Sequence, residues 1–439
     1  MSRPSRVSFS PDVISGIIGK TPGQRTIADG FQFRCVMQRD EKIIAALTGC
    51  SHALSHGYLL IFPAVLLLLQ KEFSIGYLEL GVIGNIMNFT YGLGALPGGM
   101  IYNYLGPKKL YLTCFLGSAL TVILVARSSG LFLFTAGLAL LGILGSIYHP
   151  LANSLITSKV REYGGALGIH GAAGNIGLAS TPFIMGLIAS YLGWRQAFLW
   201  SALPGVILSV WALFVDMSPR EEMRTTGPAP AQQSPPRRLK AYFSLPLVLL
   251  YLTNMFQGFS FSGSLIFLPA YMAKRTSFHL FSLDSVALGG MLSAIVLAVG
   301  VLGQYGGGIL AQKPRLERKL LLMPILSFPF ILAMSFTTDL LLLIIALLFF
   351  FFNFFLQPMN NALLARYTAV EMRGTAFGIY FFLSFVFGSL ASSFCGFIAE
   401  SFGLKWVFLG LSSSVLLLIF TAFFLVKIEG PMDCEPKSL

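Results

Sequence analysis

The sequence has 439 residues, of which 55% are hydrophobic and only 11% are charged, and its formal net charge is +12. Soluble domains carry roughly a quarter charged residues, so this composition excludes an ordinary soluble protein and indicates helices that lie in lipid. The positive charge would favour a nucleic-acid partner in a soluble chain, but here we expect no nucleic acid, because the basic residues gather in alternate loops.

Residues 1–42 are polar and basic, without the apolar core that a cleavable signal peptide needs, and they predict a cytoplasmic N-terminal tail. Beyond the tail, apolar stretches of about 20 residues or more, the length that crosses a bilayer, recur between short polar breaks. They predict twelve transmembrane helices near residues 43–70, 77–104, 108–126, 131–158, 164–191, 195–216, 244–273, 284–311, 318–337, 339–366, 373–400 and 404–427.

The segment between the sixth and seventh predicted helices, residues 217–243, is rich in Pro, Gln and charge and predicts a cytoplasmic linker. It separates an N-terminal six-helix bundle, residues 43–216, from a C-terminal bundle, residues 244–427, which a cytoplasmic tail, residues 428–439, follows. Most of the 30 Lys and Arg residues lie in the tails, the linker and alternate loops, which predicts that both termini are cytoplasmic. We expect an integral protein of the plasma (inner) membrane, embedded in the lipid bilayer as a monomer.

The two predicted bundles resemble each other in sequence. GGALGI at 164–169 recurs as GTAFGI at 374–379, and GWRQAFL at 193–199 recurs as GLKWVFL at 403–409, both at an offset of 210 residues. A constant offset indicates a duplicated six-helix unit. The expected fold is therefore all-α and integral to the membrane, with two pseudo-symmetric bundles that enclose a substrate path at their interface.

The loop after the second predicted helix, GMIYNYLGPKK at 99–109, resembles the cytoplasmic signature of the major facilitator superfamily, G-x-L-a-D-r-x-G-r-k, and GILAQK at 308–313 repeats it. Both copies have an amide where the family has Asp, so hydrogen bonds replace the family's ion pair. The resemblance implies a twelve-helix transporter with a cytoplasmic gate at these turns. The gate residues are Gly99, Asn103, Gly106, Lys108, Gly308, Gln312 and Lys313.

The fifth predicted helix resembles the antiporter pattern of the same family, G-x8-G-x3-G-P-x2-G-G, at Gly168, Gly177, Pro182 and Gly186, although two glycines are replaced. Such glycines permit close helix contact and the proline bends the helix, which would help to seal the path on one side. In the family this pattern accompanies export by antiport, so the resemblance implies efflux. Ordinary packing of small residues is the alternative interpretation.

Within the superfamily, SHALSH at 51–56 and LLGILGSIYHP at 140–150 are similar to the fosmidomycin-resistance-type efflux proteins, which carry a Ser-His start in helix 1 and a His-Pro in helix 4. That subgroup has acidic residues at the places that His56 and Leu151 occupy in this sequence. Its proton-coupling scheme therefore does not transfer directly to this chain.

Polar side chains recur inside the first, fourth, seventh and tenth predicted helices, which line the central cavity in this superfamily. The stretch FFFFNFFLQPMNN at 349–361 places one stripe of amides on an otherwise aromatic helix. Because polar groups are costly in lipid, we expect these side chains to face the cavity or a neighbouring helix. The predicted cavity residues are His52, His56, His149, Asn153, Asn254, Gln257, Asn353, Gln357 and Asn361.

No Asp or Glu falls in the middle of a predicted helix, so histidine is the leading group that could exchange a proton near neutral pH. His56 and His149 are the first candidates for a proton carrier during alternating access, and His52 and His170 are the second. A neutral histidine that only donates and accepts hydrogen bonds is the alternative for each of them.

The sequence has no phosphate-binding loop, no recognisable catalytic triad and no metal-ligand spacing among its five cysteines, so we expect neither an enzyme, nor a cofactor, nor a metal site. The leading hypothesis is a secondary active transporter that exports a small organic solute in exchange for protons. An importer or facilitator of a small organic acid, or a non-transporting membrane sensor with the same fold, are the alternatives.

Overall fold

The computed structural model describes residues 38–160, 163–218, 239–278, 280, 282–368 and 373–428. Within these ranges the side chains at 95–104, 157, 163–165, 239–240 and 373–375 are left undescribed. All regular secondary structure in the described ranges is helical. Residues 1–37 and 429–439 of the predicted tails, and residues 219–238 of the predicted linker, lie outside them, whereas residues 39–42 of the N-terminal tail are the first turn of a helix.

The helices of the first half are α1 (Arg39–Phe73), α2 (Tyr77–Leu105), α3 (Pro107–Ala126), α4 (Leu131–Ser146), α5 (Tyr148–Lys159), α6 (Tyr163–Leu192) and α7 (Trp194–Leu213). Those of the second half are η3 (Leu239–Phe243), α9 (Leu245–Arg275), α10 (Ser285–Ala298), α11 (Gly300–Ala311), α12 (Leu316–Met334), α13 (Asp339–Tyr367), α14 (Arg373–Ser401), η5 (Leu404–Trp406) and α15 (Val407–Ile428).

Each of the twelve predicted segments coincides, within a few residues, with one helix or with a consecutive pair, so the expected all-α membrane fold is confirmed. The pairs are α4 with α5, which meet at Ile147, and α10 with α11, which meet at Val299. In the described part of the chain, eight helical stretches are long and apolar enough to cross a membrane. The two segments of α1, bent by 48° next to Pro63, form a ninth if they are counted together.

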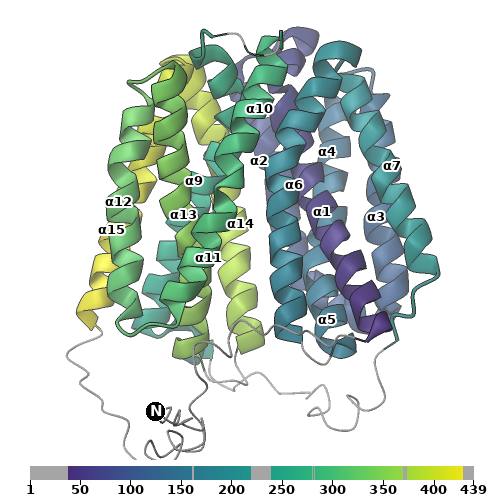
Figure 1. Ribbon diagram of the computed structural model, residues 1–439, viewed down its shortest axis with the longest axis vertical. Coiled ribbons are helices and arrows are strands. Elements are labelled where there is room, and N and C mark those ends of the chain that lie inside the picture. The colour runs from purple at the N-terminus through teal and green to yellow at the C-terminus, as the bar shows by residue number, and fades with distance from the viewer. Residues whose placement is uncertain are drawn as a thin grey trace, which may run out of the picture.

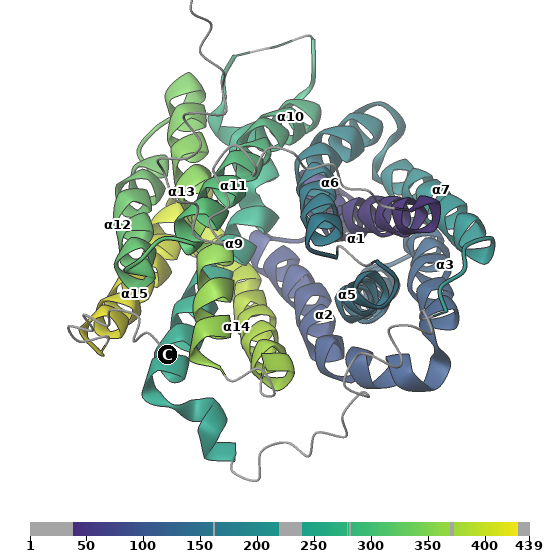
Figure 2. The ribbon, with the colours of Figure 1, turned by 60° about the horizontal axis from the view of Figure 1, so that its bottom comes forward.

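The helices form two bundles that stand side by side, α1–α7 in one and α9–α15 in the other (Figures 1 and 2). Helix α1 begins and α15 ends at the same end of the molecule, the lower end in Figure 1, which we call the terminal side. The opposite end is the far side. The sequence predicts that the terminal side is cytoplasmic.

The two bundles pack closely in the far half of the molecule, where α2 lies against α14 and α6 against α10. Small residues allow this approach. A methyl group on Gly81 of α2 would collide with the carbonyl of Ser392 on α14, and one on Gly290 of α10 would collide with the carbonyl of Pro182 on α6.

Toward the terminal side, α6 separates from the other bundle. Gly168 and Gly171 lie seven and four residues before Asn175 on the face of α6 that meets the other bundle, and Gly308 lies one turn after Gln304 on the facing side of α11. A Cβ atom built on any of these three glycines would have no neighbour within 4 Å. The bundles therefore touch in the far half, and the space between α6 and α11 opens toward the terminal side.

Candidate functional site

Four histidines that are distant in sequence meet inside the N-terminal bundle. His52 and His56 come from α1, His149 from α5 and His170 from α6, and we call them the histidine cluster. The ring centre of His52 lies 4.7 Å from that of His56, 5.1 Å from His149 and 4.0 Å from His170. The fifth histidine of the chain, His279, lies outside the described residues.

Local packing determines where the cluster forms. His52 and His56 are one turn apart on α1, and His149 follows directly after the break between α4 and α5. The His52 ring packs directly against the backbone of Gly174 on α6. A Cβ atom built on residue 174 would lie only 2.5 Å from the ring. Glycine at 174 therefore makes room for His52 between α1 and α6.

Hydrogen bonds fix the tautomer of His52. Its Nδ1 donates to the backbone carbonyl of His170 at 2.7 Å, which leaves Nε2 as an acceptor. That Nε2 is buried and accepts no hydrogen bond from a described residue. The Tyr148 hydroxyl donates to the Thr48 carbonyl at 2.5 Å and lies 3.4 Å from Nδ1 of His170. A buried acceptor without a donor is unfavourable, so the Nε2 position suits a bound proton or an arriving polar group.

The cluster is not shaped as a metal centre. The ring nitrogens of His52, His149 and His170 lie within 4.8 Å of one another. Tetrahedral zinc at about 2.0–2.1 Å from each nitrogen would bring them to about 3.3 Å apart. In addition, the rings of His52 and His170 are stacked at an interplanar angle of 11°, so their lone pairs run parallel and do not converge. The arrangement suits proton exchange between imidazoles better than metal binding.

The histidine cluster lies beside the interface between the bundles. Tyr91 of α2 meets His149 edge to face with ring centres 6.3 Å apart, and it meets Phe385 of α14, in the other bundle, at 5.4 Å. Among the described residues, every Lys, Arg, Asp and Glu lies in a terminal turn of a helix or between helices. In that part of the chain, the imidazoles are therefore the side chains of the membrane interior that can become positively charged.

The amides predicted for the C-terminal bundle mostly join helices inside that bundle. Asn254 donates to the carbonyl of Tyr380 at 3.1 Å, and Gln257 donates to the carbonyl of Asn353 at 3.4 Å. Asn360 donates to the side chain of Gln257 at 2.8 Å. These side chains are at most 8% exposed, so hydrogen bonding between helices explains why polar groups occur at these positions. A contact with substrate stays a prediction.

Two other predicted amides are more accessible. Asn153, one turn beyond His149 on α5, is exposed, and Asn361 on α13 is half-buried. The side-chain oxygen of Asn361 is itself buried and accepts no hydrogen bond from a described residue. Whether these two face a substrate also stays a prediction.

Gln357 has a hydrogen-bond partner that was not predicted from the sequence. It accepts a hydrogen bond from Gln304 of α11 at 2.9 Å, and Gln304 accepts one from Asn175 of α6 at 2.7 Å. Asn175, Gln304 and Gln357 together, the amide bridge, connect the two bundles. Asn175 and Gln304 are single amides within glycine-rich apolar helices, GNIG and GQYGGG, and that pattern could have indicated them.

Of the predicted gate residues, Gly106 adopts a φ of +74° at the turn into α3, where a side chain would be strained. Lys108 donates to the carbonyl of Leu213 at the end of α7 at 3.0 Å. Gln312 caps the end of α11, Lys313 is exposed and Gly308 borders open space. Nothing is described of the surroundings of Gly99 or of the side chain of Asn103, so the role of this gate stays a prediction.

In the glycine pattern of α6, Gly177 meets the backbone of Ala53 on α1, while Pro182 and Gly186 meet α10 at Gly290 and at the carbonyl of Val286. Gly168, in contrast, has open space around it. Three members of the pattern thus lie at close helix contacts, two of them between the bundles.

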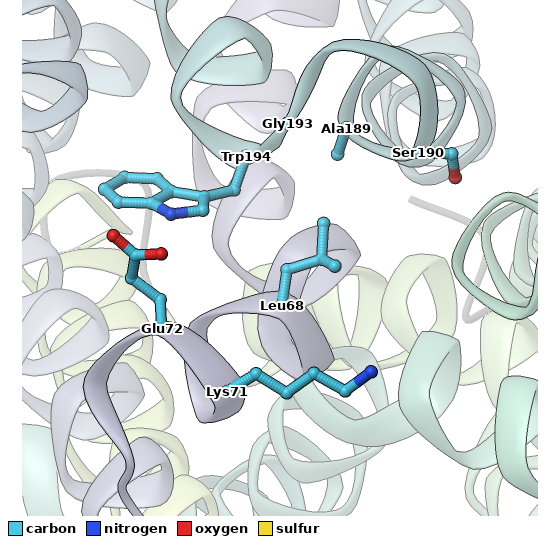
Figure 3. A pocket seen from close by; sticks show the side chains of 7 residues that line it. All are labelled: Leu68, Lys71, Glu72, Ala189, Ser190, Gly193 and Trp194. Atoms are coloured by element: carbon cyan, nitrogen blue, oxygen red, sulfur yellow. The ribbon is translucent and has the colours of Figure 1, made fainter.

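A separate open depression lies on the far side, at the ends of α1 and α6 and the start of α7 (Figure 3). Its volume is about 420 Å³, and Glu72 at its edge pairs with Arg195 at 2.6 Å. Leu68 in its lining is sixteen residues from His52, more than four turns of α1. The depression is therefore distant from the histidine cluster.

Comparisons with known proteins agree with this architecture. A family model described as Major Facilitator Superfamily matches residues 45–392. The probable sulfoacetate transporter SauU of Cupriavidus necator is 26% identical over 74% of this chain and 81% of that protein. The nitrite extrusion protein of Bacillus subtilis is 29% identical over 54% of this chain and 58% of that protein.

Among solved structures, a bacterial homolog of the human lysosomal transporter Spinster, inward-facing and unoccupied, matches with a TM-score of 0.72. The match covers 89% of this chain and 97% of the other at 14% identity, which shows a shared fold alone. These comparisons do not single out the fosmidomycin-resistance-type subgroup, which stays a prediction.

Proposed function

The chain belongs to the Major Facilitator Superfamily, and on that premise we propose that it moves a small organic acid across the membrane as an anion together with a proton. The chain is a membrane transporter of small solutes and not an enzyme. The observation that best supports joint movement of an anion and a proton is the histidine cluster beside the interface between the bundles.

Electrostatics links the anion to the proton. An anion that enters a cavity of low dielectric constant needs a positive partner, because its desolvation is otherwise too costly. The described Lys and Arg residues lie at helix ends, out of reach of the cluster, so a protonated imidazole is the partner that the interior offers. Binding of the anion then raises the affinity of the cluster for a proton, and the proton raises the affinity for the anion by the same factor.

The relatives are consistent with this substrate class. The one that shares the longest aligned stretch among those described above is named for sulfoacetate, a small organic anion, and the second is named for the extrusion of nitrite, a small inorganic anion. Under the proposal, the far half of the interface is the closed gate, and the described conformation is open to the cytoplasm through the terminal side.

Transport by the purified full-length chain in proteoliposomes tests the proposal. The probes are radiolabelled sulfoacetate and a panel of small carboxylates and sulfonates, with a pH gradient imposed in either direction. We expect a member of the panel to accumulate in the more alkaline compartment, and a protonophore to abolish the accumulation. Absence of flux for the whole panel, or flux that ignores the gradient, would overturn the proposal.

Export by proton antiport is a second candidate, favoured by the close contacts of Gly177 and Pro182 on α6, which follow the antiporter pattern. The same vesicles separate the two candidates, because an antiporter accumulates its solute in the more acidic compartment. A symporter accumulates it in the more alkaline one.

A further inference from the structure

The amide bridge marks the edge of the open space between the bundles. Among the described residues of α6 and α11, Asn175 and Gln304 make the polar contact nearest the terminal side, and Pro182 and Gly186 meet α10 farther out. One turn beyond the bridge, Gly171 and Gly308 face open space. A molecule that enters from the terminal side would therefore reach the bridge first.

The bridge leaves hydrogen-bond donors available. Each amide NH2 group has two hydrogens. The bridge uses one hydrogen of Asn175 and one of Gln304, and the NH2 group of Gln357 donates to no described residue. Gln357 is exposed and Gln304 is half-buried, so their donors are accessible from the open space, whereas Asn175 is buried behind them and only 5% exposed.

The histidine cluster lies near the bridge along α6, on the face of that helix that packs against α1. Asn175 follows Gly174, whose Cα packs against the His52 ring, and His170 lies five residues earlier on the same helix. One short stretch of α6 thus carries a cluster that can bind a proton and an amide that can donate to an oxygen atom.

We infer that Asn175, Gln304 and Gln357 form the subsite that holds the anionic group of the substrate, a carboxylate or sulfonate, next to the histidine cluster; this inference rests on the proposed function. The oxygens of such a group accept hydrogen bonds from the amide NH2 groups and replace the bonds that the amides make with each other. Neutral amides hold an anion without a permanent charge, so the anion can leave once the cluster loses its proton.

The subsite spans the two bundles. Asn175 belongs to one bundle, and Gln304 and Gln357 belong to the other. An anionic group held by all three keeps its full set of hydrogen bonds only while the bundles stay close at the bridge. Substrate binding therefore favours conformations in which α6 and α11 remain together at this level, because it stabilises them more than the others.

Variants at the bridge, studied in the proteoliposomes described above with the best transported member of the panel, test the inference. Asn175→Ala and Gln304→Ala should each raise KM about tenfold or more. The matched control is Asn85→Ala, because Asn85 of α2 also makes one amide hydrogen bond across the bundles, to Ser393 of α14 at 3.0 Å. That variant should leave KM within twofold of the unaltered chain.

Asn175→Asp separates a binding role from a structural one. The carboxyl group can still form a hydrogen bond with Gln304 and so preserve the bridge, but its ionised form repels an anion. We expect Asn175→Asp to have a higher KM than Asn175→Ala at pH 8, and the difference to shrink as the pH falls, because protonation of the carboxyl group removes the repulsion.

The subsite would be overturned if Asn175→Asp transported as well as the unaltered chain, or if Asn85→Ala and Asn175→Ala changed KM equally. Either result would leave the proposed function intact. Failure of the unaltered chain to transport any member of the panel would overturn both.

Discussion

Glu400 near the end of α14 accepts a hydrogen bond from the backbone N–H of Tyr77, the first residue of α2, at 2.7 Å. This contact joins the two bundles on the far side. Ser190, which corresponds to Glu400 at the repeat offset of 210, donates to Asp284 at the start of α10 at 2.5 Å. The duplicated halves therefore close the far side with two related contacts, and each contact has one carboxylate.

Neutralising Glu400 should weaken the far-side closure. A carboxylate at a helix N-terminus is stabilised by the N–H groups and the helix dipole, so Glu400→Gln should cost about 1 kcal/mol, or about fivefold in the conformational equilibrium. Ser392, which is buried in the same interface, can be replaced by cysteine in a cysteine-free background to report opening. Its rate of labelling by a membrane-impermeant thiol reagent should rise about fivefold.

Glu79→Gln is the control for that experiment. Glu79 accepts from the backbone N–H of Gly76 at 3.0 Å at the start of the same helix, but it makes no hydrogen bond or ion pair with a described residue of the other bundle. Its neutralisation should leave the labelling rate unchanged. Equal acceleration by both variants would show that the charge at the start of α2 matters and that the contact between the bundles does not.

The glycines of α6 should differ in how they tolerate alanine. At Gly168 the added methyl has open space, and the higher helix propensity of alanine favours a neutral or slightly stabilising effect, up to about 1 kcal/mol. At Gly177 the methyl collides with the backbone of Ala53, so Gly177→Ala should destabilise the protein by about 1–3 kcal/mol. Thermal unfolding in detergent measures both, and equal melting temperatures would contradict the close packing of α1 on α6.

The sequence was sufficient to predict the helices and their order, because a span of about 20 apolar residues between polar breaks leaves few other structures in lipid. The breaks at Ile147 and Val299 were not predicted, although each has a breaker beside it. Pro150 cannot donate to the carbonyl of Ser146, where α4 ends, and Gly300 directly follows Val299. The bend of α1 lies next to Pro63 in the same way. Hydrophobic length therefore predicts membrane helices well, whereas their irregularities depend on single prolines and glycines that it does not register.

Side-chain partners were harder to predict than helices. The sequence indicated that His52, His56, His149 and His170 were unusual, but only packing shows that three helices bring them together. For the amide stripe of α13, the sequence could not distinguish Asn353, which is buried inside its bundle, from Gln357, which reaches the interface. Helical spacing defines a face, and the neighbouring helices decide what that face meets.

Removal of the proton-binding groups should uncouple transport from the pH gradient. His56→Gln with His149→Gln keeps polar side chains of similar size but removes two imidazoles of the cluster. Accumulation driven by the gradient should fall to background, whereas exchange of labelled for unlabelled substrate at equal pH should persist at a reduced rate. Accumulation at the level of the unaltered chain would show that the cluster does not carry the coupling proton.

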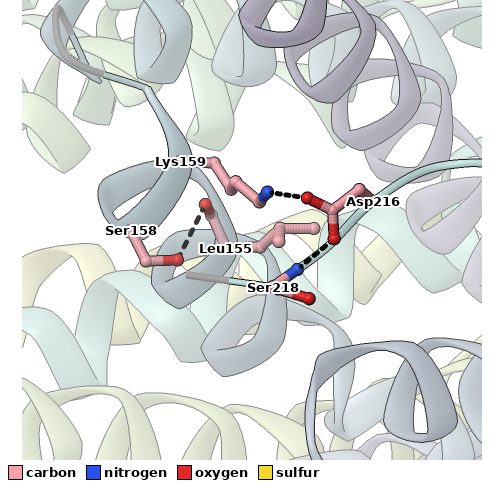
Figure 4. A network of polar contacts seen from close by, with 5 residues as sticks. All are labelled: Leu155, Ser158, Lys159, Asp216 and Ser218. Atoms are coloured by element: carbon pink, nitrogen blue, oxygen red, sulfur yellow. Dashed lines mark hydrogen bonds and ion pairs between the residues drawn. The ribbon is translucent and has the colours of Figure 1, made fainter. Parts of the chain in front are cut away.

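Lys159 at the end of α5 donates to the carboxylate of Asp216, just beyond α7, at 2.6 Å, and the backbone N–H of Ser218 donates to the other oxygen at 2.9 Å (Figure 4). The hydrogen bond from Lys159, followed by that from Ser218, lowers the pKa of Asp216 to about 2. Since the pKa is lower in the folded protein, the contact stabilises the fold above about pH 4, and this contribution is lost as the pH falls toward 2.

The size of this contribution is limited by solvent, because the Asp216 side chain is 72% exposed. After screening we expect about 0.5 kcal/mol, so Asp216→Asn should lower the melting temperature by roughly 1 °C, equally at pH 6 and pH 8. Lys159→Met should have a similar effect, and the double variant should add little to either, because both remove the same ion pair. The assignment of this pair would be contradicted if the decrease in melting temperature caused by Asp216→Asn grew between pH 6 and pH 8. It would also be contradicted if the decreases caused by the two single variants added fully in the double variant.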